Sequence, residues 1–195
     1  MTPQPLIDIT DEHGTPTGQR TTIDDANNKG LWHRTAHVVI YTPDKQVLVQ
    51  KRSDSIIRYP GFLDMSLGGV MHAGEAPEQT LQRRASEELG LTIDPDQLKF
   101  ISSTKYNHPV PSYGKHVRVI LMNYILEIPT TKVTLRYLET EVSWAGFIDW
   151  DLADTLTTKG TVKNLGKLIP RYAYYQQLLT AARTSSEETK HSLQK

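Results

Sequence analysis

The sequence predicts an α/β domain in which helices pack in layers against a mixed β-sheet. Runs rich in valine and isoleucine, typical of strands, alternate along the chain with segments of helical periodicity. Apolar residues make up 37% of the chain and charged residues 23%, so a buried core is expected. A length of 195 residues suits one domain with at most a short appendage.

The N-terminal elements follow from turn and capping residues. The segment LIDITDEHGTPTGQR (6–20) alternates in polarity and breaks at DEHG, which predicts a hairpin. A short helix is expected next, with Thr22 as its N-cap, Asp25 as the capping partner and Gly30 as its end. Two Val- and Ile-rich runs in 36–53 flank the turn TPDK and predict a second hairpin.

The centre of the chain predicts a strand followed by a helix. FLDMSLGGV (62–70) is the strand, and it leads into paired glycines. APEQTLQRRASEELG (76–90) is the helix, because Pro77 suits its first turn and Gly90 its C-terminal cap. Apolar residues recur at helical spacing and predict its buried stripe: Leu81, Ala85 and Leu89.

The C-terminal half predicts more strands and two helices. Apolar runs indicate strands over 99–106, 116–128 and 142–148. Helices are expected over 149–156, with Asp149 as N-cap, and over 169–183, opened by Pro170. The last residues, 184–195, are polar without periodicity and are expected to form a flexible tail.

Composition excludes several classes of function. Lys plus Arg and Asp plus Glu are both 22, and this zero net charge argues against a nucleic-acid-binding surface. The chain has no cysteine, which excludes disulfides, thiolate metal sites and a cysteine nucleophile. No stretch is apolar enough to span a bilayer, and the N-terminus lacks a basic start and an apolar run. A soluble cytoplasmic protein is expected.

The polar side of helix 76–90 is a candidate metal site. Glu87 and Glu88 are expected on an exposed face opposite the apolar stripe, and the glycine-rich turn LGGVMHAGE can bring backbone carbonyls near them. Magnesium prefers such oxygen ligands and bridges phosphate oxygens of a substrate. The alternative is a solvated helix face with two i,i+4 ion pairs, Arg83–Glu87 and Arg84–Glu88.

Residues 67–91 resemble the Nudix box, written G-x5-E-x7-R-E-U-x-E-E-x-G-U, where U is a bulky aliphatic residue. The chain supplies the following residues at the required spacings: Gly69, Glu75, Arg83, Glu87, Glu88, Gly90 and Leu91. Arg84 replaces the first glutamate of the REUxEE core, and Ala85 stands at its aliphatic position. GLWHR, VLVQKRSDSIIRYPGFLD and EVSWAGFIDWDLADTL extend the likeness over roughly residues 5–180, toward the branch that includes isopentenyl-diphosphate isomerase.

The resemblance implies an α/β/α sandwich, with residues 1–30 part of the same unit and 31–183 forming the Nudix domain. It also implies a small-molecule diphosphate substrate, with Mg²⁺ or Mn²⁺ as cofactor and water attacking phosphorus. By motif position, the metal ligands would be the Gly69 carbonyl, Glu87 and Glu88. Glu88, Glu87 and Arg83 would form the catalytic set, with Arg83 holding Glu87 in place.

The resemblance also implies substrate contacts outside the motif. Basic residues of the family face the diphosphate at the positions of Lys51 and Arg52, and Arg58 is a further candidate; the alternative is a basic strand end at the surface. Loop residues that either select the substrate or simply pack are Tyr106, His108, Tyr113 and His116. Some Nudix hydrolases take a general base from a loop near Glu139 and Glu141, although Glu141 also suits a solvated strand start.

The sequence argues against isomerase chemistry. For the isomerase, the resemblance implies an active site with a cysteine-and-glutamate acid/base pair around a metal that is held partly by histidines. This chain has no cysteine. Alignment places Gly68 at the cysteine position and Val70 at a histidine ligand. His33 is the one retained histidine, and it equally suits a packed strand start.

Two functions remain open from the sequence. The first is a metal-dependent Nudix hydrolase of a nucleoside or other organic diphosphate, weakened by Arg84. The second is a catalytically impaired Nudix domain that binds a diphosphate ligand or a protein partner. Arg84 keeps the second open, because it replaces a carboxylate and can pair with Glu88.

Overall fold

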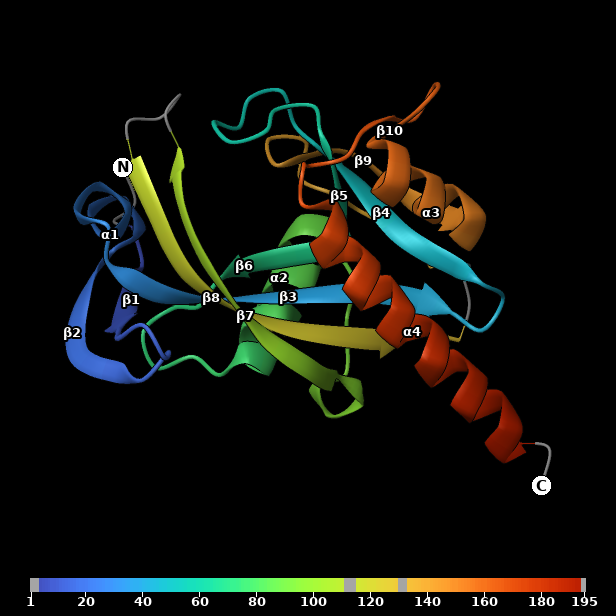
Figure 1. Ribbon diagram of the computed structural model, residues 1–195, viewed down its shortest axis with the longest axis horizontal. Coiled ribbons are helices and arrows are strands. Elements are labelled where there is room, and N and C mark those ends of the chain that lie inside the picture. The colour runs from blue at the N-terminus through green and yellow to red at the C-terminus, as the bar shows by residue number, and fades with distance from the viewer. Residues whose placement is uncertain (1–3, 111–114, 130–132, 194–195) are drawn as a thin grey trace.

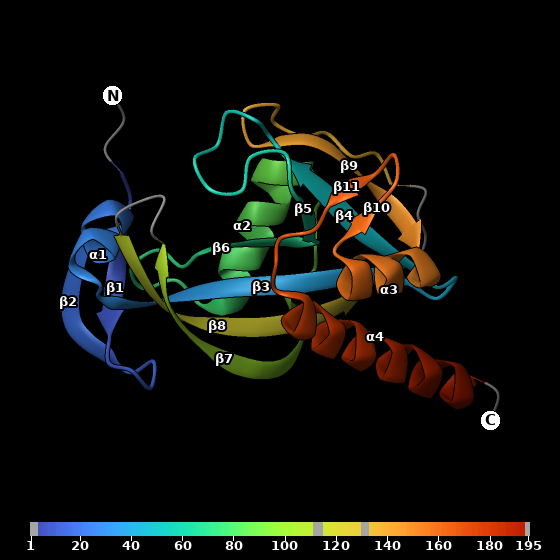
Figure 2. The same ribbon diagram turned by 45° about the horizontal axis from the view of Figure 1, so that its top comes forward.

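A mixed β-sheet lies between layers of helices in the computed structural model, which describes residues 4–110, 115–129 and 133–193 (Figures 1 and 2). The elements are, in chain order, β1 (Leu6–Thr10), β2 (Pro16–Thr22), α1 (Ile23–Lys29), β3 (Trp32–Thr42), β4 (Gln46–Arg52), β5 (Leu63–Met65), β6 (Leu67–Val70), α2 (Pro77–Leu89), the 3-10 turn η1 (Pro95–Gln97), β7 (Lys99–Val110), β8 (Lys115–Glu127), β9 (Val142–Asp149), α3 (Trp150–Lys159), β10 (Thr161–Val162), β11 (Gly166–Lys167) and α4 (Tyr172–Leu193). The predicted α/β architecture is confirmed.

Strand β3 is the centre of the sheet. It pairs in parallel with β8 and antiparallel with β1, β4 and β6, so the sheet is mixed. Strand β7 extends the sheet beyond β8, while β5 and β9 both pair with β4. The hairpin β1–β2 and helix α1 pack at one end of the domain, where β1 continues the sheet (Figure 1).

Each face of β3 builds its own core. Val38 and Ile40 point toward α2 and pack with its predicted stripe, whose leucines and alanine are fully buried. Val39 and Tyr41 point to the opposite face, where α3 and α4 cover the sheet. The alternation follows from the two-residue repeat of a strand, and it leaves α2 fixed against β3 and β6.

The capping residues act as predicted at α1, while other details differ. The hydroxyl of Thr22 accepts the N–H of Asp25 at 3.3 Å, and Gly30 ends the helix in the left-handed region. The expected strand 62–70 is two strands, because β5 pairs with β4 and β6 with β3. Asp149 is the N-cap residue of α3, as predicted, but its carboxylate accepts a hydrogen bond from the Gln46 amide at 3.0 Å and none from the helix.

The prediction of a flexible tail over 184–195 differs from the structure. Helix α4 begins at Tyr172 and continues to Leu193, and Ser185 and Ser186 are buried. The ammonium of Lys99 on β7 donates to the Ser185 hydroxyl at 2.8 Å, so tertiary contact extends a helix whose polar sequence lacks clear periodicity. Residues 194–195 lie outside the described part.

None of the helices in the described residues combines the length and apolarity that crossing a membrane requires.

Candidate functional site

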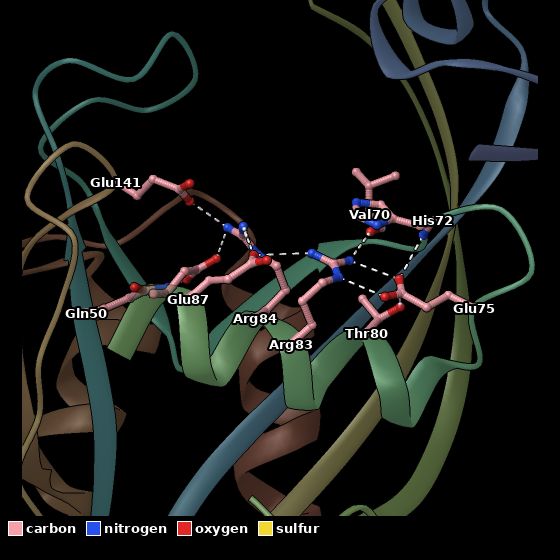
Figure 3. Close-up of polar contacts among 10 residues, drawn as sticks. Gln50, Val70, His72, Glu75, Thr80, Arg83, Arg84, Glu87 and Glu141 are labelled. Atoms are coloured by element: carbon pink, nitrogen blue, oxygen red, sulfur yellow. Dashed lines mark hydrogen bonds and ion pairs between the residues drawn. The ribbon is translucent and has the colours of Figure 1, made fainter. Parts of the chain in front are cut away.

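Figure 3 shows Arg83 joining helix α2 to the loop that follows β6. Its Nε donates to Glu75 Oε1 at 2.7 Å and its Nη2 to Oε2 at 2.9 Å, which is a bidentate pair. Nη2 also donates to the Val70 carbonyl at 3.2 Å, and Glu75 accepts the Thr80 hydroxyl at 2.7 Å. The contact of Arg83 with Glu87 is longer, at 3.3 Å. Arg83 therefore chiefly fixes the loop at Glu75.

The carboxyl of Glu75 makes stability depend on pH. Burial raises its pKa, but the hydrogen bonds with Arg83, the His72 N–H and Thr80 lower it from 4.5 to about 2. A depressed folded-state pKa gives stability that is complete above pH 4.5 and is lost as the pH falls toward 2.

We expect Glu75→Gln to cost about 2 kcal/mol of unfolding free energy at neutral pH, and this difference from the wild type to vanish in acid. Urea unfolding of both proteins across this pH range measures it, and a difference that stays constant with pH would contradict the expectation.

The guanidinium of Arg84 lies among three carboxylates, of which two, Glu87 and Glu141, are labelled in Figure 3. Nη1 donates to Glu87 Oε2 at 3.1 Å, and Nη2 donates to Glu141 Oε2 at 2.6 Å and to Glu88 Oε1. Glu87 and Glu88 belong to α2, whereas Glu141 directly precedes β9. Burial alone would lower the pKa of Arg84, but the charge of Glu88 and the contact with Glu141 raise it. The side chain therefore remains a cation that ties α2 to the segment before β9.

Glu88 is buried, so the expectation that it lies on an exposed face was wrong. The exposed fraction of the residue is 4%, and its carboxylate is in contact with Gln50 of β4. The Gln50 amide on β4 donates to Glu88 Oε2 at 2.9 Å, while Oε1 receives Arg84. Burial raises the pKa of Glu88, and the charge of Arg84 and the hydrogen bond from Gln50 offset part of that rise.

Glu88→Gln is therefore expected to destabilise the fold. A glutamine at 88 removes the negative charge that pairs with the Arg84 guanidinium, and its NH₂ group finds an acceptor only if the Gln50 amide turns to present its oxygen. The expected loss is about 2 kcal/mol of unfolding free energy. Glu87→Gln is the matched control, because the Glu87 side chain is 47% exposed and its loss should be small. Equal unfolding curves for the two variants would contradict this.

A cavity of about 380 Å³ opens beside α2, and we call it the arginine cavity. The arginines in its wall are Arg52, Arg58, Arg83, Arg84 and Arg171. Among the described residues neither Arg58 nor Arg171 forms an ion pair. Burial and the charge of Arg171 lower the pKa of Arg58, so the two cations repel each other across the cavity. Asp64 and the neighbouring tyrosines raise the pKa of Arg171 against the effect of burial, so its charge is partly balanced although no carboxylate in the described part of the chain pairs with it directly.

Asp64 is the one carboxylate among the described residues that line the arginine cavity. Its Oδ1 accepts the Tyr175 hydroxyl at 2.6 Å and lies 3.6 Å from His37 Nε2, while Oδ2 lies 3.9 Å from Arg52 Nη1. Burial would raise the pKa of Asp64, but His37, Tyr175 and Arg52 hold it well below the usual range. The Tyr174 hydroxyl joins His37 Nδ1 at 2.8 Å, which extends this network into α4.

Two smaller cavities adjoin the arginine cavity. The carboxylate cavity, of about 90 Å³, is lined by Gln50, Arg52, Ile56, Gly68, Arg84, Glu88 and Glu141. The tyrosine cavity, of about 280 Å³, is lined by Thr104, Tyr106, Leu121, Pro170, Arg171, Tyr172, Ala173 and Tyr174. Arg84 is shared with the first and Arg171 with the second, so each arginine stands at a boundary.

A family model described as NUDIX domain matches residues 31–172, which is well over half of the chain. The chain belongs to the Nudix family. The predicted Nudix-like α/β/α sandwich is confirmed by similarity in fold to the crystal structure of DR0079 from Deinococcus radiodurans. That similarity has a TM-score of 0.64 at 20% identity, over 89% of this chain and 98% of the other.

Sequence relatives of this Nudix domain include an isomerase and a hydrolase. The chain is 31% identical over 109 residues to an isopentenyl-diphosphate Delta-isomerase of Streptomyces griseus, covering 56% of this chain and 54% of that protein. It is 38% identical over 85 residues to an uncharacterized Nudix hydrolase of Streptomyces coelicolor, covering 44% and 46%. The chain thus spans about half the length of the curated relatives that it matches.

The side chains around Arg84 do not fit the divalent metal expected of a Nudix box. In the described residues, no group of three or more histidine, aspartate or glutamate side chains is arranged to hold a metal ion. Glu87 and Glu88, the predicted ligands, both accept hydrogen bonds from Arg84, and Gly69 lies against its aliphatic stem. A guanidinium therefore stands where the carboxylates converge.

The other predicted residues of the Nudix domain divide into those that line a cavity and those that do not. Arg52 and Arg58 line the arginine cavity, whereas Lys51 is absent from the described linings because successive strand residues face opposite ways. Tyr106 lies in the tyrosine cavity beneath the Arg171 guanidinium, 4.7 Å from ring centre to carbon.

The predicted loop residues that the structure describes lie wholly or partly at the surface, whereas His33 is buried. His108 is exposed and packs beside the Tyr106 ring, His116 contacts Asn107, and Glu139 is exposed on the segment before β9. Tyr113 lies outside the described residues. His33 lines the arginine cavity, where burial lowers its pKa, and its Nδ1 contacts the Leu31 carbonyl at 3.2 Å.

Sequence reasoning missed Arg171, Asp64 and His37. An acid inside the apolar stretch FLDM was a usable signal for Asp64, since a buried carboxylate needs partners. The sequence places Arg171 only at the opening of a helix, because its approach to Arg58 depends on how α4 docks on the sheet.

Proposed function

We propose that this Nudix domain binds the diphosphate group of a small organic molecule in the arginine cavity. The observation that carries the proposal is that Arg58 and Arg171 face this cavity without an ion pair among the described residues. Guanidinium groups match phosphate oxygens with paired hydrogen bonds, and an anion between two such cations relieves their repulsion. Membership of the Nudix family supports a diphosphate over other anions.

The tyrosine cavity supports an organic group attached to that diphosphate. It shares Arg171 and Leu121 with the arginine cavity, so one molecule can extend from one into the other. Its wall is mostly apolar, and the Tyr106 ring already stacks on a planar cation. A flat or apolar group of the ligand would find similar contacts there.

Calorimetric titration with ADP-ribose, UDP-glucose, geranyl diphosphate and pyrophosphate tests the proposal. We expect at least one organic diphosphate to bind more tightly than pyrophosphate, because it also fills the tyrosine cavity. Arg52→Ala should weaken that binding about tenfold or more. Lys51→Ala is the matched control on the same strand and should leave it unchanged. Failure of every probe to bind, or equal losses in the two variants, would contradict the proposal.

A second candidate is metal-dependent hydrolysis of the same diphosphate, which the similarity to proteins named Nudix hydrolases supports. The convergence of Glu87, Glu88 and Glu141 on one cation favours it, because these are oxygen ligands that a divalent metal would use once Arg84 moved away. Magnesium-dependent phosphate release from the same panel separates catalysis from binding.

A further inference from the structure

The position of Arg84 suggests what it replaces. Its guanidinium donates to carboxylates from two separate segments, at 3.1 Å to Glu87 and 2.6 Å to Glu141, and it also contacts Glu88 (Figure 3). These side chains approach from different directions, so a positive charge lies where their oxygens meet. Without a cation the carboxylates would repel one another, because Glu88 is buried and cannot turn toward water.

Gly69 provides the space for this arrangement. A Cβ at residue 69 would lie 2.6 Å from Arg84 Cγ, 2.7 Å from Cδ and 2.9 Å from Nε. Such distances are far shorter than normal contacts, so a larger residue at 69 would displace the arginine stem. Gly69 lies on β6, which faces α2, and this close packing of strand and helix directs Arg84 to the carboxylates.

Arg84 also faces the place where a ligand would lie. It lines both the carboxylate cavity and the arginine cavity, and its side chain is 19% exposed. Its Nε is buried and donates to no atom among the described residues. The Nη atoms of Arg84 therefore donate to carboxylates, while the side chain also lines the arginine cavity together with Arg52 and Arg58.

We propose that Arg84 is an internal cation that takes the place of the divalent metal, so that the arginine cavity binds its anionic ligand without a metal ion. Gly69 keeps the room that the arginine needs, and Glu87, Glu88 and Glu141 hold the guanidinium in position. The metal half of this inference stands on the geometry of Arg84 alone. The ligand half rests on the proposed function.

Titration of the ligand-free protein with Mn²⁺ and Mg²⁺ tests the metal half. The wild type is expected to show no saturable binding at millimolar metal. Arg84→Met and Arg84→Lys are a matched pair of similar length that differ in charge. We expect the methionine variant to gain at least a tenfold increase in metal affinity and the lysine variant to remain close to the wild type. Tight metal binding by the wild type, or an equal gain in both variants, would overturn this half.

Gly69→Ala checks the same half without altering any charge. The added methyl group should push Arg84 away from the carboxylates, and metal affinity should rise as in Arg84→Met. Circular dichroism shows whether the Gly69→Ala variant is folded. If it is not, the Arg84→Met and Arg84→Lys variants alone test the metal half. A folded Gly69→Ala protein that stays unresponsive to metal would overturn the role given to Gly69.

The ligand half is tested with ADP-ribose titrated into the wild type in excess EDTA and again in excess Mg²⁺. We expect dissociation constants within about twofold of each other. Binding that appears only with Mg²⁺ would overturn the ligand half while leaving the proposed function intact. Absence of binding in both conditions, repeated with the other probes of the panel, would overturn the ligand half and the proposed function together, and the metal titrations would still decide the metal half.

Discussion

Arg84→Glu is expected to convert the carboxylate cluster into a divalent-metal site. The formal charge of residues 84, 87, 88 and 141 changes from −2 to −4, because one cation is replaced by a fourth acid. Two unit charges about 4 Å apart interact by roughly 1 kcal/mol in water and roughly 4 kcal/mol at an effective dielectric of 20. A two-unit change beside a dication therefore raises metal affinity by at least tenfold, with the exposure of Glu87 and Glu141 favouring the lower end.

Calorimetry with Mg²⁺ and Mn²⁺ measures this gain, and phosphate release from the diphosphate panel shows whether hydrolysis rises with it. The metal-free variant should also unfold at a lower temperature than the wild type, because four neighbouring acids repel one another, and added metal should restore its stability. Arg84→Gln is the control, since it removes the cation without adding an acid and should give a smaller gain. Metal affinity of Arg84→Glu equal to that of the wild type would refute the expectation.

Replacing both Arg58 and Arg171 with alanine is expected to weaken diphosphate binding by about a hundredfold or more. Each guanidinium can donate a pair of charge-assisted hydrogen bonds to phosphate oxygens, and each such contact is worth about 1.5–3 kcal/mol. The two side chains come from separate parts of the chain, the segment after β4 and the segment before α4, and both line the arginine cavity, so the double variant removes both contacts.

The measurement is calorimetric titration of the double variant with the ligand that binds the wild type best. Arg20→Ala is a control for general charge loss, because Arg20 lies on β2 and pairs with Asp8 at 2.9 Å, away from the cavity. Circular dichroism establishes that both variants are folded. Binding of the double variant within threefold of the wild type would place the diphosphate elsewhere.

Most of the fold follows from local sequence signals. The helix at 76–90 carries its own start, stop and apolar stripe, and α1 carries its own capping residues, so neither needs information from distant segments. The parallel pairing of β3 with β8 joins segments far apart in the chain and has no local signature. The helical residues after 183 were missed for the same reason, since contacts such as Lys99–Ser185 stabilise them.

In the candidate site too, the residues that local spacing predicts differ from those that depend on distant segments of the chain. The Nudix box identified the residues that meet Arg84 on α2 because their spacing on one helix fixes their relative positions. The burial of Glu88 could not be read from that spacing, because it depends on Gln50 from β4. The place of Arg171 in the arginine cavity could not be predicted for a similar reason, because only the docking of α4 brings Arg171 close to Arg58.

Arg58 and Arg171, which form no ion pair among the described residues, lower the stability of the fold while providing the cations for binding an anion. Arg58 and Arg171 repel each other in the ligand-free protein, and burial adds the cost of removing Arg58 from water. Folding must overcome this unfavourable term, and a bound anion removes it. Uncharged side chains at these positions would ease folding while removing the groups that recognise phosphate. Under the proposed function, the most stable form of this cavity is therefore not the form that binds best, and a bound diphosphate would add to the stability of the protein.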